Sequence, residues 1–214
     1  MLEAKEVFKS YNGLEVLKGI NLSVNKGEVI SIVGASGAGK STLLHLLGTL
    51  DAPDRGTISI AGKHLERLGS HQLSTFRNEQ IGFIFQFHNL FPEFTALENV
   101  CMPAFIKGDK NAQAKASDLL DRLGLKDRIA HKPSELSGGE QQRVSVARAL
   151  INKPSIVFAD EPSGNLDSSS ADGLHQLFFD LRNELDQTFV IVTHNMELAG
   201  MADRKLEIAD GKIL

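Results

Sequence analysis

The amino-acid sequence predicts an α/β fold in which a mainly parallel sheet is flanked by helices. Short β-branched runs alternate along the chain with longer segments whose apolar residues recur every three or four positions. Two of the short runs, Ile156–Ala159 and Val190–Val192, are apolar at every position. A strand of that kind is buried on both faces, as a parallel strand between two layers of helices is.

The individual elements follow from the same patterns. Strands are expected at Val29–Val33, Thr57–Ile60, Ile81–Phe85, Ser155–Ala159, Phe189–Thr193 and Lys205–Ile208, and helices at Ser41–Leu47, Asn111–Leu123, Gly139–Leu150 and Ser169–Leu185. The segment before Ile60 is rich in strand residues and in turn signals, and it predicts an antiparallel β layer beside the main sheet. Its turn signals are Asn12-Gly13, Asn25-Lys26-Gly27 and Arg55-Gly56.

A single domain spanning residues 1–214 is expected, because no repeat, low-complexity tract or long Pro/Gly-rich linker interrupts the chain. Residues 1–86 and 153–214 would form the core with its β layer. The segment from Phe87 to Lys132 reads as mostly helical, so residues 87–152 are expected to form a small helical lobe.

The overall composition excludes several classes of protein. The net charge of −4 gives no general attraction to nucleic acid or to anionic lipid. Cys101 is the only cysteine, so no internal disulfide can form and no metal-type cysteine spacing occurs. No signal peptide is evident at the N-terminus, and no segment approaches the roughly 18 apolar residues that cross a bilayer. We therefore expect no nucleic-acid partner and no direct membrane insertion.

A glycine-rich run follows the first of the buried strands. It reads Gly34-Ala35-Ser36-Gly37-Ala38-Gly39-Lys40-Ser41-Thr42 and leads into a predicted helix. This strand, loop and helix match the P-loop of nucleoside triphosphatases, in which successive backbone N–H groups surround a phosphate. Lys40 would contact the β and γ phosphates of ATP, and the Ser41 hydroxyl would bind Mg²⁺.

Two carboxylates follow the buried strand that begins at Ile156. Asp160 and Glu161 would lie at the carboxyl edge of the parallel sheet, where such folds bind their ligands. Asp160 would hold Mg²⁺ through water, and Glu161 would orient and polarise the attacking water. Taken alone, this pair fits a solvated turn equally well; the P-loop favours the catalytic interpretation.

A second glycine-rich helix start occurs at Leu136-Ser137-Gly138-Gly139-Glu140-Gln141-Gln142. Ser137 is a good N-cap, and the helix that follows directs its dipole at whatever binds there. This run closely resembles the signature sequence of ATP-binding cassette (ABC) transporter ATPases, although the frequent fifth residue of that signature, Gln, is Glu140 here. The resemblance extends over the whole chain and implies an ABC-type fold with a RecA-like core.

Membership of the ABC family would imply a magnesium-dependent ATP hydrolase that works as a homodimer formed on ATP binding. In that family Ser137, Gly138, Gly139 and Glu140 of one subunit would cover the ATP held by the P-loop of the other. Four further residues match positions of the family in chain order. Tyr11 would be the aromatic residue that stacks on adenine, and Gln86 the glutamine that touches Mg²⁺ and water. Asp167 would lie in the D-loop at the dimer interface, and His194 would be the switch histidine at the γ-phosphate.

The run Phe83–Val100, together with Ser163–Asp167, resembles the branch of the family that holds lipoprotein-releasing, macrolide-export and cell-division ATPases, and the lipoprotein-releasing type most closely. That resemblance implies integral membrane subunits as partners and a position at the cytoplasmic face of the inner membrane. A macrolide-type exporter, or a cell-division complex with a regulatory role, is the alternative. A DNA-repair ATPase of the family would need a long coiled-coil insertion, and the sequence has no heptad run of that length. A ribosome-associated factor would normally carry two cassettes, and one is expected here.

Four large apolar residues follow Gln86 in a short segment that also holds Pro92. They are Phe87, Leu90, Phe91 and Phe94. Two interpretations remain open at this stage. Part of the set forms an exposed pocket for a helix of a membrane subunit, or the four residues fill the core of the small lobe.

Overall fold

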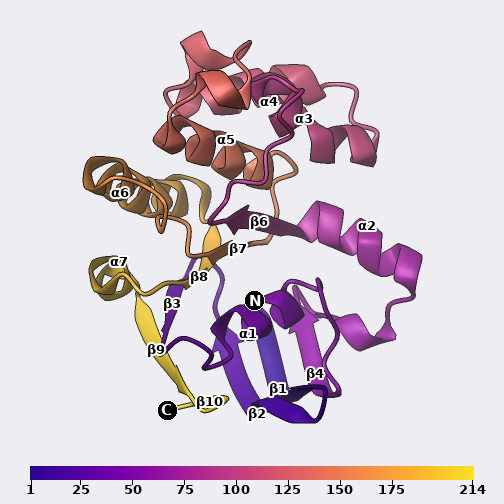
Figure 1. Cartoon of the computed structure of the whole chain (residues 1–214). Coiled ribbons are helices and arrows are strands. Elements are labelled where there is room, and N and C mark those ends of the chain that lie inside the picture. Colours follow the sequence, from indigo (N-terminus) through magenta and orange to yellow (C-terminus); the bar gives the residue numbers. More distant parts are fainter.

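The computed structural model describes residues 1–214 and has a central sheet of six strands (Figure 1). Their order is β10-β9-β3-β8-β7-β6, and all neighbours are parallel except β9 and β10. The mainly parallel sheet is thereby confirmed. The strands are β3 (Val29–Val33), β6 (Ile81–Phe85), β7 (Ile156–Asp160), β8 (Thr188–Val192), β9 (Arg204–Ala209) and β10 (Lys212–Ile213).

Successive residues of the central strands enter two different hydrophobic clusters, because side chains alternate between the faces of a strand. On β7, Val157 and Ala159 join one cluster, while Ile156 and Phe158 join the other. All four side chains are fully buried. The unbroken apolar runs of the sequence are explained by this burial on both faces.

The antiparallel layer has the strand order β2-β1-β4-β5 and lies below the central sheet in Figure 1. Its strands are β1 (Leu2–Tyr11), β2 (Leu14–Val24), β4 (Arg55–Ile60) and β5 (Lys63–His64). One predicted turn is wrong: Arg55-Gly56 opens β4 instead of preceding a strand. Pairing with β1 continues past an irregularity to Phe8, opposite Arg55, and the guanidinium of Arg55 lies 4.3 Å from the Phe8 ring centroid.

The helices are α1 (Lys40–Leu47), α2 (Ser70–Gln80), α3 (Ala96–Lys107), α4 (Ala112–Arg122), α5 (Gly138–Leu150), α6 (Ser168–Leu185) and α7 (Met196–Met201), with short 3-10 turns at Leu65–Arg67, Lys126–Arg128 and Pro133–Glu135. The predicted helices correspond to α1, α4, α5 and α6, within one residue at each end. No helix combines the length and apolarity that crossing a bilayer requires.

No sequence pattern predicts α2 or α7, and α3 lies in the segment Phe87–Lys132, which the sequence predicts as mostly helical without giving bounds. Only Phe76 of α2 is buried, so this helix has no apolar stripe to reveal it. Helix α7 is too short for a periodic pattern. Helix α3 does carry a usable signal, because Thr95 and Glu98 form a capping box at its start.

The helices lie on opposite sides of the central sheet. Buried leucines of α1 belong to the cluster shared with the antiparallel layer, whereas buried residues of α3, α4, α5 and α6 belong to the cluster on the other face. Figure 1 shows α3, α4 and α5 together above the sheet and α1 below it. The starts of α1 and α5, which hold the two predicted phosphate sites, are thus separated within one chain.

Candidate active site

The loop between β3 and α1 is shaped by glycines at two positions whose backbone angles disfavour any residue with a Cβ. Gly34 has φ +148°, and a Cβ there would lie 2.2 Å from the Ile208 carbonyl oxygen. Gly39 has φ +102°, and a Cβ there would lie 2.7 Å from a methyl carbon of Leu17. Gly39 also caps α1 without a side-chain hydrogen bond, so the first N–H groups of the helix keep their capacity to bind an anion.

Lys40 folds back over this loop. Its Nζ donates hydrogen bonds to the carbonyl oxygens of Gly34 at 2.9 Å and Ala35 at 3.0 Å. The ammonium group is therefore held at the loop that would receive a triphosphate, with backbone carbonyls as its partners in the free protein.

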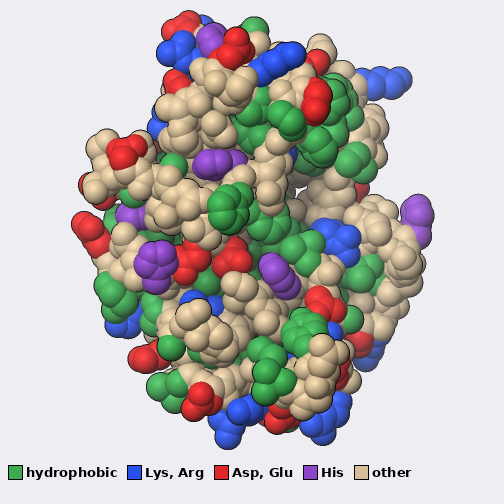
Figure 2. All heavy atoms as spheres, viewed as in Figure 1, with side chains coloured by type: hydrophobic (Ala, Val, Ile, Leu, Met, Phe, Trp, Pro, Cys, Tyr) green, Lys and Arg blue, Asp and Glu red, His purple; other side chains and the backbone are tan.

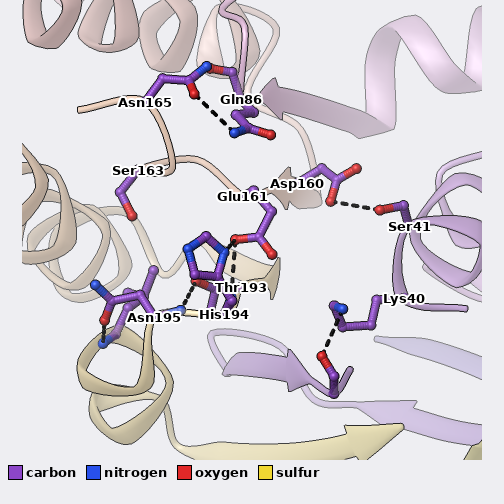
Figure 3. A network of polar contacts seen from close by, with 12 residues as sticks. Lys40, Ser41, Gln86, Asp160, Glu161, Ser163, Asn165, Thr193, His194 and Asn195 are labelled. Carbon is purple, nitrogen blue, oxygen red and sulfur yellow. Dashed lines mark hydrogen bonds and ion pairs between the residues drawn. The ribbon is translucent and has the colours of Figure 1, made fainter. Parts of the chain in front are cut away.

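Ser41 and Asp160 meet across the sheet. The Ser41 hydroxyl donates to Asp160 Oδ1 at 3.1 Å, and His45 Nε2 lies 4.0 Å from the other carboxylate oxygen (Figure 3). Burial raises the pKa of Asp160, an effect that the Ser41 hydrogen bond partly offsets. The structure thus joins a hydroxyl and a partly desolvated carboxylate that the sequence predicted to share one ligand.

Glu161 is held against His194. Its Oε2 accepts a hydrogen bond from the His194 backbone N–H at 3.1 Å and lies 2.8 Å from the imidazole Nδ1 (Figure 3). Glu161 also has φ +46°, a strained conformation for a residue with a side chain, and such strain concentrates at functional sites. The two predicted residues are brought into contact, one from the end of β7 and one just after β8.

Gln86 follows β6 and contacts the segment after Glu161. Its Nε2 donates to Asn165 Oδ1 at 3.0 Å, and Asn165 Nδ2 donates back to the Gln86 carbonyl at 3.2 Å. The Gln86 side-chain oxygen points away from Asn165 (Figure 3). Asn165 belongs to the run Ser163–Asp167, so two predicted segments that are far apart in sequence are joined by a pair of amides.

Ser137 and Glu140 form a reciprocal cap at the start of α5. Ser137 Oγ accepts from the Glu140 N–H at 3.2 Å, and Glu140 Oε2 accepts from the Ser137 N–H at 2.8 Å. Arg128 donates to the other Glu140 oxygen at 2.8 Å. These bonds, led by that of the Ser137 backbone, lower the pKa of Glu140. Glu140 therefore orders the helix start that contains Gly138 and Gly139.

Asp167 caps the next helix, α6. Its carboxylate accepts hydrogen bonds from the Ser170 N–H and from the hydroxyls of Ser169 and Ser170, and these bonds strongly lower its pKa. Within one chain the contacts of Asp167 are those of a helix cap. The dimer-interface role expected from the family resemblance stays a prediction.

Tyr11 lies at the end of β1, half-exposed, with its hydroxyl donating to Asp51 Oδ2 at 2.6 Å. This hydrogen bond is the main cause that raises the pKa of Tyr11 to about 12. Lys9 lies 5.1 Å from the ring centroid. The ring is thus fixed by its hydroxyl, and its stacking on adenine stays a prediction.

Several polar residues that hold these segments in place are not predicted from the sequence. His175 of α6 is buried, and its Nε2 lies 2.9 Å from Ser163 Oγ. Gln142 and Arg148 of α5 bond backbone carbonyls beside Gln86. A polar residue on the buried face of an apolar helix pattern is the signal that could have revealed them.

A family model for ABC transporters matches residues 17–164, which cover the β3–α1 loop, the capped start of α5, and Asp160 with Glu161. The chain belongs to the ABC transporter family. Two ATP-binding proteins LolD of lipoprotein-releasing systems are similar over 100% of this chain: that of Cytophaga hutchinsonii is 61% identical over 99% of its own length, and that of Bacteroides fragilis 58% over 100%.

A solved dimer of an ATP-binding cassette, in a post-hydrolysis state bound to ADP and Pi, has a TM-score of 0.90 and 39% identity, covering 100% of this chain and 96% of that one. The predicted ABC fold and the resemblance to lipoprotein-releasing ATPases are confirmed. This ABC protein is an ATPase that hydrolyses ATP to ADP and phosphate.

Proposed function

We propose that two copies of this ABC ATPase close head to tail on two ATP molecules, and that closure drives integral membrane subunits to release lipoproteins from the inner membrane. The observation that carries the head-to-tail arrangement is the separation of the two helix starts. The loop before α1 and the start of α5 lie on opposite sides of the sheet. One triphosphate can be bound by both only when a second copy supplies one of them.

In the closed dimer the triphosphate lies on the N–H groups of Gly34–Gly39 and at the start of α1. Lys40 exchanges its two carbonyl partners for phosphate oxygens, a stronger charge-assisted contact. Ser137–Gly139 of the second copy cover the γ-phosphate from the other side, where the α5 dipole favours negative charge. Tyr11 stacks on the adenine.

The residues around Asp160 fit Mg²⁺. Ser41 and Asp160 present oxygen atoms 3.1 Å apart, and Mg²⁺ binds through one or two carboxylates together with substrate phosphates and water. Asp160 is partly buried, and desolvation raises its pKa despite the Ser41 hydrogen bond and the nearby charges of His45 and Lys40; a divalent ion would favour the ionised carboxylate further. Gln86 would add its side-chain oxygen. When bound, Mg²⁺ neutralises charge that develops on the phosphates.

Glu161 is positioned to align water for attack on the γ-phosphate. Its Oε2 is held by His194, which leaves Oε1 to accept a proton from the water. His194 therefore fixes the carboxylate and lies at the same edge of the sheet as the γ-phosphate. Because Glu161 and the second copy's signature meet only in the closed dimer, hydrolysis depends on closure.

The Phe-rich segment after Gln86 provides a docking surface for a membrane subunit. Phe87, Phe91 and Phe94 are 74%, 47% and 37% exposed, whereas Leu90 packs against the core. The buried Asn99 amide shapes the segment, since it donates to three carbonyls there and accepts from the Phe91 N–H. The structure thus favours the exposed pocket over the interpretation in which the four residues fill the lobe.

A groove beside this segment is lined by residues of α2, β6, α3 and α5, among them Phe83, Phe85, Phe91, Pro103 and Arg148. Figure 2 shows hydrophobic side chains gathered over the α3 region of this face. A groove that combines aromatic rings with polar side chains suits one amphipathic helix. The occupant we propose is a cytoplasmic helix of the membrane subunit.

Phe91→Ser and Phe94→Ser are expected to reduce co-purification with the membrane subunits by about tenfold or more, because each removes a large apolar contact. Pull-down from detergent extracts measures this, and circular dichroism checks folding. Leu185→Ser is the control, since Leu185 is 42% exposed at the end of α6 and belongs neither to the Phe-rich segment nor to the groove. Undiminished assembly by both folded variants would contradict the docking surface.

The function itself is tested with the complex rebuilt in vesicles of inner-membrane lipid that carry a lipid-anchored protein. We expect release of the anchored protein only with ATP and Mg²⁺ outside the vesicle, on the face that this chain occupies. Full hydrolysis without release would favour the regulatory alternative and overturn the lipoprotein assignment.

A further inference from the structure

We propose that Gln142 and Arg148 of α5 are positioning residues that hold the segments carrying Gln86 and Glu161 in their working geometry. The inference rests on the catalytic roles proposed above for Gln86 and Glu161. Neither Gln142 nor Arg148 would touch nucleotide; each acts through backbone groups beside a residue that does.

The Gln142 side chain is fully buried and joins two loops. Its Nε2 donates to the Pro162 carbonyl at 2.7 Å and to the Phe85 carbonyl at 3.3 Å. Pro162 follows Glu161, and Phe85 precedes Gln86. One buried amide therefore connects the two catalytic segments.

The Gln142 amide lies where the pairing between β6 and β7 ends. The ladder between β6 and β7 ends with the pair Phe85 and Asp160, so the sheet no longer pairs the two chain segments beyond them. The Gln142 amide lies just past that point. It replaces the missing ladder bond where the segments diverge toward Gln86 and Glu161.

Arg148 holds the other side of Gln86. Its Nη2 donates to the His88 carbonyl at 2.7 Å and its Nη1 to the Asn89 carbonyl at 2.6 Å. His88 and Asn89 have φ angles of 56° and 51°. Two consecutive residues in the left-handed region are uncommon and persist only where the surroundings fix them. The guanidinium supplies two donors in one plane, which matches that task.

These contacts place Gln86 between two anchors on a single helix. That helix begins at Ser137–Gly139, the segment proposed to meet the ATP of the other copy. A rigid α5 thus fixes the distance from the signature to Gln86 and Glu161 within each subunit. A shift of about 1 Å in such groups can lower turnover by about 100-fold.

The test compares kcat and KM for ATP in the full chain without membrane subunits, because Arg148 also lines the proposed docking groove. Gln142→Leu keeps the volume but loses the donor, and Arg148→Met keeps a long stem but loses both donors. We expect kcat to fall by about 10- to 100-fold while KM changes less than about twofold, since the phosphate loop is untouched. Arg148→Lys retains one donor and should restore part of kcat.

Gln187→Leu and Arg182→Lys are matched controls. Gln187 is a buried amide that donates to the Thr188 carbonyl, and Arg182 donates to the Gly27 carbonyl; both lie away from Gln86. These controls are expected to lower the melting temperature without lowering kcat. If Gln142→Leu and Arg148→Met behave like them, or raise KM with kcat unchanged, the inference is overturned.

Glu161→Gln in the same assay distinguishes the catalytic role of Glu161 from the positioning roles of Gln142 and Arg148. Loss of turnover in Glu161→Gln, together with normal turnover in the α5 variants, would remove only the positioning roles. Normal turnover in Glu161→Gln would remove the proposed catalytic role of Glu161 and, with it, the positioning of Glu161 by Gln142. Should Gln142→Leu not fold, the kcat of Arg148→Lys relative to Arg148→Met decides.

Discussion

Glu161→Gln is expected to lower ATP turnover by about 100-fold or more while leaving ATP affinity unchanged, because general-base catalysis contributes on that scale. The amide oxygen of glutamine can still accept the His194 backbone hydrogen bond, so the local geometry is preserved. What disappears is the ability to take a proton from water. ATP then remains bound, and the closed dimer should accumulate.

Phosphate release measures the turnover, and size-exclusion chromatography with ATP measures the dimer. Glu207→Gln on the exposed face of β9 makes the same change in charge and serves as the control. A Glu161→Gln variant with wild-type turnover would exclude Glu161 as the group that activates water.

Lys40→Ala is expected to weaken ATP binding itself, by about 10- to 100-fold, since a hydrogen bond to a charged group contributes about 1.5–3 kcal/mol. In the free protein Lys40 only bonds the carbonyls of Gly34 and Ala35 near the surface, so its loss should change the melting temperature little. The deficit should appear as a loss of affinity and not as unfolding.

Titration with a fluorescent ATP analogue measures that affinity, and thermal denaturation without nucleotide checks the fold. Lys205→Ala removes an equal charge from the exposed side of β9 and controls for the change in net charge. Retention of wild-type affinity in Lys40→Ala would show that the β3–α1 loop is not the phosphate site.

Elements that are marked by a pattern among neighbouring residues were predicted well from the sequence. The unbroken apolar run of β7 indicated burial on both faces, and the structure divides it between two clusters. The helix starts at Lys40 and Gly138 were placed within one residue. Both signals act over one turn of helix or two residues of strand, which is the range over which sequence patterns report structure.

The family resemblance supplied the roles of Tyr11, Gln86, Asp167 and His194, which their local sequence could not. Without that resemblance, Tyr11 fits an ordinary strand residue and His194 an ordinary structural histidine. Only the fold shows what holds them, since Asp51 fixes the Tyr11 hydroxyl and Glu161 fixes His194.

Residue patterns along the chain were enough to indicate an α/β ATPase, a glycine-shaped phosphate loop and carboxylates after a buried strand. Which groups meet depends on the folded domain: Ser41 donates to Asp160, 119 positions away, and the Gln142 amide joins the segments beside Gln86 and Glu161. The cause is the order of the strands in the sheet. The strand order β3-β8-β7-β6 is set by packing of the whole domain, and no local sequence pattern indicates it.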